Sequence, residues 1–223
     1  MQISSFNSLN AIFFLQCEKY QKEDHLFFNN LNLKKFQTYT WSDTTNNVLK
    51  LAKFLNEKNI SKGDRVLLVS ENRPEWLIAD LAILLNSAIT VPNYTTYTVN
   101  DFAFTINDCK PSGLIVSTPQ LLKNILLAAK KINYNFNFII LLNQANESVA
   151  GNVVNFSTVL EKKIDIEETK IFFRGINKSL TRKDPACIIY TSGTQGTPKG
   201  VVLSHGGILK NCEGALEFLY FIK

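Results

Sequence analysis

One stretch sets the fold class of this chain: RVLLVSENRPEWLIADLAILLNSAITV, residues 65–91. It begins with a short apolar strand at residues 65–70, and Pro74 then starts a helix that continues to Leu85. Proline is well tolerated there, because the first-turn N–H of a helix has no intrahelical partner. A second apolar strand follows at residues 88–91. Strand, helix and strand in this order, with both strands apolar throughout, predict parallel strands covered on both faces.

The same alternation extends on both sides of this stretch. Downstream we expect, in order, a helix at 98–108, a strand at 113–117, a helix at 119–131 and a strand at 136–142. Upstream, apolar spacing predicts a helix within residues 1–20, and two β-like runs at 25–28 and 36–40 predict a hairpin. Thr40 and Asp43 then predict a capping box at the start of the next helix. We therefore expect an α/β fold with a mostly parallel sheet flanked by helices.

The last third of the chain is less regular. We expect a polar loop (143–151), short helices (156–183), and two strands (186–190 and 200–203). The two strands are expected to form an incomplete second sheet, after which Ser204 caps a final helix. That helix ends in an apolar run, Leu216 to Ile222, which needs a surface to bury against.

The composition excludes several classes of protein. The chain has 223 residues, of which 45% are hydrophobic and 19% charged, so it is neither disordered nor collagen-like. The net charge of +5 is spread over the chain without a dense Lys/Arg run, so we expect no nucleic-acid partner. No apolar run approaches the roughly 18–20 residues that span a bilayer.

Cysteine and histidine usage gives no metal site. The four cysteines and two histidines are Cys17, Cys109, Cys187, Cys212, His25 and His205. None of them shows metal-ligand spacing, and widely separated cysteines without an export signal indicate reduced thiols. We therefore expect no metal ligand and a cytoplasmic protein. For Cys187, within a buried strand, and for His205, at a helix start, we expect structural roles.

The segment with the chemical signal is IYTSGTQGTPKGVVLSH, residues 189–205. Its central part, residues 191–199, is called the phosphate loop below. Glycines allow a ligand close to the backbone, threonine and serine supply hydroxyl donors, and Lys199 adds a positive charge. Two familiar phosphate motifs do not fit, because Lys199 lacks the following Ser/Thr of a P-loop and the glycines lack dinucleotide spacing. An ordinary surface turn is the alternative, but it would not need so many donors.

Residues 190–201, YTSGTQGTPKGV, resemble the signature loop of the AMP-forming adenylating superfamily. One position departs from the usual pattern: Gln195 stands where a second threonine is common. The resemblance implies that the loop binds the phosphates of ATP. The residues implied are Thr191, Ser192, Gly193, Thr194, Gln195, Gly196, Thr197 and Lys199. It assigns no catalytic residue and no metal ligand within this chain.

Three upstream segments are similar to the long-chain fatty acid–CoA ligase branch of that superfamily: KGDRVLLV (62–69), NRPEWLIADLA (72–82) and AITVPNYTT (88–96). The resemblance implies ATP with Mg²⁺, a fatty acid and coenzyme A as reactants. Members of the branch carry further motifs downstream, one for Mg²⁺ and one for the ribose, and a C-terminal domain. Residues 1–223 would then be the N-terminal portion of the large adenylate-forming domain, ending shortly after the signature loop.

A partial adenylate-forming domain lacks motifs that the reaction needs. We expect the chain to be inactive unless a second, C-terminal polypeptide complements it. The alternatives are a nucleotide-binding module without turnover and a gene remnant without function. Many relatives act at membranes, so peripheral attachment to the inner face of the membrane stays open beside a cytoplasmic location.

Overall fold

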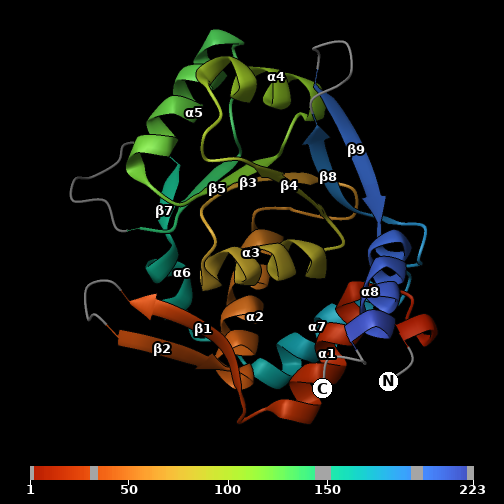
Figure 1. Cartoon of the computed structure of the whole chain (residues 1–223). Helices are drawn as coiled ribbons and strands as arrows, with labels where there is room; N and C mark the ends of the chain where they lie inside the picture. Colours follow the sequence, from red (N-terminus) through yellow and green to blue (C-terminus); the bar gives the residue numbers. More distant parts are fainter. Residues whose placement is uncertain (1–2, 31–34, 144–151, 192–197, 220–223) are drawn as a thin grey trace.

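The computed structural model describes residues 3–30, 35–143, 152–191 and 198–219 of the chain (Figure 1). Seven strands form the main sheet, in the order β7-β6-β5-β3-β4-β8-β9. They are β3 (Arg65–Val69), β4 (Ile89–Asn93), β5 (Gly113–Val116), β6 (Phe138–Leu141), β7 (Val153–Asn155), β8 (Pro185–Thr191) and β9 (Lys199–Ser204). All neighbours pair in parallel except β8 and β9, which are antiparallel. The expected α/β fold with a mostly parallel sheet is confirmed.

Helices cover both faces of this sheet (Figure 1). They are α1 (Leu9–Tyr20), α2 (Trp41–Glu57), α3 (Pro74–Leu85), α4 (Val99–Cys109), α5 (Pro119–Lys131), α6 (Phe156–Glu161), α7 (Ile166–Asn177) and α8 (His205–Leu219), with a 3₁₀ turn η1 at Ile3–Ser5. Side chains of β3 alternate between two buried clusters, since Val66 and Leu68 face α2 and α3 while Leu67 and Val69 face α4 and α5. Continuous apolar strands are therefore buried on both sides.

Two helix starts follow the same local rule. The Thr40 hydroxyl accepts the backbone N–H of Asp43, whose carboxylate accepts the N–H of Thr40 at 3.0 Å. Thr98 and Asp101 make the same reciprocal pair at the start of α4. Each capping box satisfies donors that the first turn leaves unpaired, so both helices begin where the sequence predicts.

The predicted hairpin is also present. Strands β1 (Asp24–Asn30) and β2 (Lys35–Thr40) form an antiparallel two-stranded sheet of their own beside α2 (Figure 1). Trp41, directly after β2, stacks on His25 of β1 with ring centroids 3.6 Å apart. The hairpin is thereby joined to the first turn of α2.

Two expectations for the last third of the chain need correction. The strands β8 and β9 do not form a second sheet but extend the main one, because β8 pairs with β4 at Thr90 and Cys187. The short strand β7, which pairs with β6, was not predicted. Its three residues are only half-buried, so the strand lacks the continuous apolar pattern that marks the others. The polar loop expected at 143–151 lies almost wholly outside the described residues.

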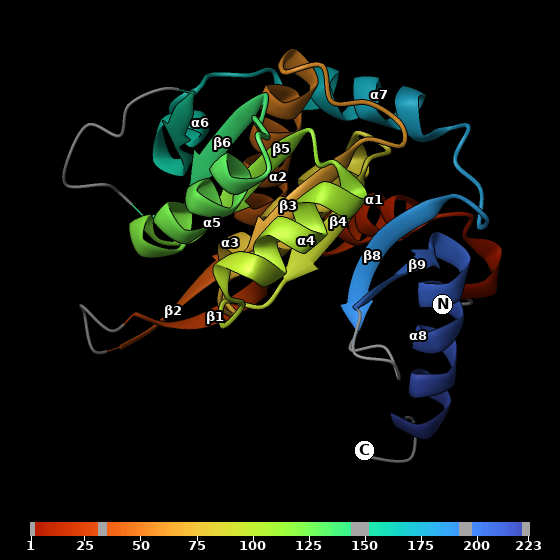
Figure 2. The ribbon, with the colours of Figure 1, turned by 90° about the horizontal axis from the view of Figure 1, so that it is seen from above.

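The N-terminal segment contacts the start of the last helix. His205, the first residue of α8, accepts the backbone N–H of Leu9 on its Nδ1 atom at 3.3 Å. Arg182, shortly before β8, donates to the carbonyl oxygen of Phe6 at 2.9 Å. Figure 2 shows α1 beside the start of α8, whose C-terminal part extends away from the other elements. The N-terminal segment thus packs against the start of α8 and the segment before β8.

We predict that Gly113→Ala destabilises the protein by about 1–3 kcal/mol, because small residues enlarged in a packed core force shifts of their neighbours. A Cβ atom at this position would lie 2.1 Å from Cζ of Phe138. The measurement is the free energy of unfolding from urea titration. Gly175→Ala in α7 is the control, since no atom outside its chain neighbours and the backbone of its own helix lies within 4 Å of its Cβ position. Equal stability of the two variants would contradict the packing.

Candidate phosphate-binding site

The phosphate loop joins two paired strands. Thr191, the last residue of β8, lies directly opposite Lys199, the first residue of β9, and both are exposed. Because β8 runs parallel to β4, the loop leaves the sheet at the carboxyl ends of the parallel strands. Ligands of open α/β sheets bind at that edge.

The structure places two of the eight predicted site residues. Thr191 and Lys199 lie at the two ends of the loop, held side by side by the strand pairing. The other six, Ser192, Gly193, Thr194, Gln195, Gly196 and Thr197, lie outside the described residues. Their role as phosphate ligands stays a prediction.

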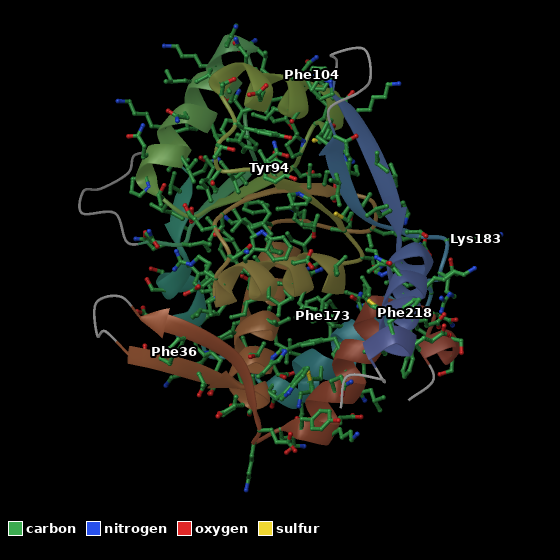
Figure 3. The ribbon with its side chains drawn as sticks, in the orientation of Figure 1. Phe36, Tyr94, Phe104, Phe173, Lys183 and Phe218 are labelled. Atoms are coloured by element: carbon green, nitrogen blue, oxygen red, sulfur yellow. The ribbon has the colours of Figure 1, made fainter. Side chains whose placement is uncertain are left out.

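Tyr190 anchors the base of the loop. Its hydroxyl donates to Oδ2 of Asp108 in α4 at 2.5 Å. Its buried ring packs edge-to-face on Phe104, with centroids 6.2 Å apart. Figure 3 labels Phe104 on α4, near the end of β8. Burial, followed by the hydrogen bond to Asp108, raises the pKa of Tyr190, so the hydroxyl stays a neutral donor. The strand end that carries the loop is therefore tied to α4.

Gly200, opposite Tyr190 in the strand pair, leaves room for this ring. A Cβ atom there would lie 3.1 Å from Cγ2 of Ile188 and 3.2 Å from Cζ of Tyr190. Both distances are tighter than ordinary carbon contacts of about 3.5–4.0 Å. Gly200 therefore has a packing role next to Tyr190.

His205 has the structural role that we expected. It begins α8, is buried, and accepts the N–H of Leu9 rather than bonding locally. Burial lowers the pKa of His205 to about 4, so the ring is neutral near pH 7. Cys187 is half-buried in β8, and burial raises the pKa of its thiol to about 12, which suppresses the nucleophilic thiolate.

A largely apolar cavity of about 820 Å³ lies on the other side of β8 from Tyr190. Its walls come from α1, α3, β4, β8, β9 and α8, and include Phe13, Trp76, Ile189, Leu203 and Ile208. Trp41 and Trp76 pack against the neighbouring core, and both also border this cavity.

Asp80 of α3 is the carboxylate in this cavity wall. Its Oδ1 atom accepts the hydroxyl of Thr90 at 2.6 Å, and burial raises the pKa of Asp80 to about 6. In the sequence Asp80 appears only as a polar break in an apolar helix. Its partner lies on a different element, so no local pattern could have identified the pair.

Other site types receive no support from the described part of the chain. Within it, no three His, Cys, Asp or Glu side chains come together in a way that could hold a metal ion. None of the helices in the described ranges combines the length and the apolar character required to cross a bilayer.

A protein-family comparison matches residues 13–220 to the family described as AMP-binding enzyme. Among curated proteins, the chain is 28% identical over 202 residues to a long-chain-fatty-acid–CoA ligase of Bacillus subtilis (strain 168), covering 82% of this chain and 35% of the relative. It is 33% identical over 162 residues to the peroxisomal long chain acyl-CoA synthetase 7 of Arabidopsis thaliana, covering 70% of this chain and 22% of the relative. The chain thus spans only a minor part of the relatives' length.

Solved structures agree on the fold. The acetoacetyl-CoA synthetase of Streptomyces lividans superposes with a TM-score of 0.76 at 16% identity, over 91% of this chain and 31% of that one. The luciferase-like enzyme of the mealworm Zophobas morio gives a TM-score of 0.73 at 21% identity, over 92% and 44%. At these identities the likeness shows the fold alone.

We predict that Tyr190→Phe lowers the free energy of unfolding by about 1–3 kcal/mol, the usual effect of removing a hydrogen bond to a charged group. The lost bond is the one to Asp108. Tyr94→Phe is the control, because Tyr94 is 66% exposed, and a change below about 0.5 kcal/mol is expected there. Chemical denaturation of both variants tests the anchor, and matching values would refute it.

A second prediction concerns pH. The folded protein holds the proton of Asp80 more tightly than the unfolded chain, whose carboxyl has a pKa near 3.8. Stability conferred by the protonated form is therefore lost as pH rises from about 4 to about 6. Relative to Asp80→Asn, the parent chain should lose up to about 3 kcal/mol across this window and then level off.

His205 titrates in the same range with opposite sign, because its folded-state pKa is lowered to about 4. It is present in both proteins, so its contribution cancels in the difference between them. The measurement is the unfolding free energy of parent and Asp80→Asn at several pH values. A difference independent of pH would show that the environment of Asp80 does not raise its pKa.

Proposed function

Because the chain belongs to the family of AMP-binding enzymes, we propose that it is the phosphate-binding portion of an AMP-forming long-chain fatty acid–CoA ligase. One observation carries the proposal: strand pairing holds Thr191 and Lys199 at the two ends of a glycine- and hydroxyl-rich loop, at the carboxyl edge of the sheet. The names of the Bacillus and Arabidopsis relatives support the choice of a long-chain acyl substrate.

The proposed reaction has two steps. A fatty-acid carboxylate oxygen attacks the α-phosphorus of ATP, the bond to the bridging oxygen breaks, and diphosphate leaves with the electron pair. The thiol sulfur of coenzyme A, having lost its proton, then attacks the acyl carbonyl carbon, and AMP leaves. The products are acyl-CoA, AMP and diphosphate.

In this chain the phosphate loop would act in the first step. Negative charge develops on the departing diphosphate, and fixed donors aimed at that charge lower the barrier. The Thr191 hydroxyl and the Lys199 ammonium group would bind phosphate oxygens from opposite ends of the loop. Tyr190 would act as a positioning residue, because its bond to Asp108 fixes the strand from which the loop starts.

The proposed reaction also needs Mg²⁺ and coenzyme A. Mg²⁺ neutralises phosphate charge when bound with ATP. The part of the chain described here brings no acidic cluster together for it. Since the chain spans 35% of the Bacillus ligase, we propose that turnover requires the remaining polypeptide, either joined to this chain or supplied separately.

A nucleotide-binding module without turnover is the second candidate. The phosphate loop favours this candidate, because binding of phosphate needs only the hydroxyl, N–H and ammonium donors of the loop. The two candidates differ in one measurement: fatty-acid-dependent exchange of labelled diphosphate into ATP, after the chain is combined with the remaining part of a relative. Exchange supports the ligase, and ATP binding without exchange supports the module.

We predict that Lys199→Ala weakens ATP binding by about 10- to 100-fold, since a charge-assisted hydrogen bond contributes roughly 1.5–3 kcal/mol. Calorimetric titration of the 223-residue chain measures this directly. Lys183→Ala is the matched control, because Lys183 is exposed just before β8 (Figure 3). It lies at the end of the β8–β9 pair opposite to Lys199. Equal ATP affinity in Lys199→Ala and the parent chain would remove Lys199 from the site.

A further inference from the structure

A second cavity, of about 500 Å³, lies between α1 and the last turn of α7. Its apolar wall includes Phe6, Ala11, Phe14 and Leu180. Sites for small molecules in proteins commonly have volumes of about 300–1,000 Å³ and apolar walls with a few polar groups. The size and lining of this cavity therefore suit a small organic ligand.

Two cations border this cavity on the α7 side. Arg174 lies in the last turn of α7, and Lys178 follows four residues later with helical backbone angles, so the two side chains share one face. Lys178 is exposed, and among the described residues it has no ion-pair partner. The single carboxylate in the lining is that of Glu18, so the lining carries a net positive charge.

Glu18 shows how an anion meets Arg174. Its carboxylate, on α1, pairs with the guanidinium of Arg174, whose central carbon lies 5.1 Å from the centre of the Phe14 ring. The side chains of Arg174 and Glu18 are 44% and 54% exposed, and ion pairs as exposed as this contribute little to stability. A carboxylate from outside can therefore replace Glu18 at little cost and place its apolar body against Phe14.

Buried amides hold the two walls in place. Nδ2 of Asn177 in α7 donates to the carbonyl oxygen of Leu85 at 2.8 Å, and Nδ2 of Asn10 in α1 donates to that of Leu84 at 2.7 Å. Both carbonyl groups lie at the end of α3, so α1 and α7 are anchored to the same part of the fold. A cavity between anchored walls is formed before the ligand arrives, which lowers the entropic cost of binding.

We propose that this cavity binds a small apolar carboxylate, with the head group between Arg174 and Lys178 and the body against Phe14. A planar guanidinium group can bind both oxygens of a carboxylate through two parallel hydrogen bonds. Lys178 would add a second charge-assisted contact from one turn further along.

This cavity is separate from the phosphate loop. It borders Leu180, before β8 begins, whereas the loop starts at Thr191, where β8 ends. In Figure 1, α1 and α7 lie at the bottom and the carboxyl end of β8 lies at the top. The inference therefore goes beyond the proposed function and does not rest on it.

The test uses 2-naphthoate as the probe and 2-naphthol, which is uncharged near pH 7, as its matched neutral counterpart. Equilibrium dialysis against the 223-residue chain measures the affinity of each. We expect 2-naphthoate to bind at least about tenfold more tightly, because a charge-assisted hydrogen bond contributes that much. The larger cavity would give the opposite preference, since Asp80 in its wall repels a carboxylate. Equal affinities for the two probes would overturn the proposal.

Variants of α7 locate the head group. Arg174→Gln should weaken binding of 2-naphthoate by about 10- to 100-fold and leave binding of 2-naphthol unchanged, whereas Arg174→Lys should keep part of the affinity. Lys170→Gln is the matched control, because Lys170 lies on the same helix but pairs with Glu167 and does not line the cavity. The same loss of affinity in Arg174→Gln and Lys170→Gln would refute a site at Arg174.

Glu18→Gln should change the affinity in the opposite direction. It removes the carboxylate that competes for Arg174, so 2-naphthoate should bind about two- to fivefold more tightly. A folding defect would weaken binding rather than strengthen it. Unchanged or weaker binding in this variant would contradict the proposed position of the head group.

ATP separates the two sites. Saturating ATP should leave the binding of 2-naphthoate unchanged, because the phosphate loop lies at the other end of β8. Displacement by ATP in the parent chain but not in Lys199→Ala would place 2-naphthoate at the phosphate loop and would overturn the proposal. Binding of 2-naphthoate by a chain that fails to bind ATP would support this second site while refuting the proposed function.

Discussion

The position of the phosphate loop depends on the hydrogen bond from Tyr190 to Asp108. The loop starts from β8, which pairs with the parallel part of the sheet at Thr90 and Cys187. The bond at 2.5 Å, and the ring packed on Phe104, tie the last turn of α4 to the end of this strand. A site that holds phosphates by positioning needs such a fixed support.

The sequence predicts helices well where the first turn carries a local signal. The expected bounds of α3 (74–85) and α5 (119–131) agree with the structure, since each helix has proline in its first turn. The sequence does not predict which strands pair when the paired strands lie far apart in the chain. One ladder position joins β8 to β4, and no local pattern shows that this position exists.

Some residues around the candidate site can likewise be predicted from the sequence, and others cannot. The resemblance of the loop to a known signature predicts Thr191 and Lys199 as site residues, and the strand pairing brings them together. Asp108 and Asp80 were not found, because each acts through a partner on another element: Tyr190, 82 residues away, and Thr90 on the neighbouring strand. Ordinary acidic residues in helices become informative only after the fold has placed them.

The contact between Leu9 and His205 has a consequence for synthesis. These residues are 196 positions apart, so the N-terminal helix cannot complete its packing until His205 has left the ribosome. Closing so long a loop is slow compared with local helix formation. Phe13 and Phe14 of α1 can pack on α2 and α3 before that, so the contact at Leu9 is the last part of the packing of α1 to form.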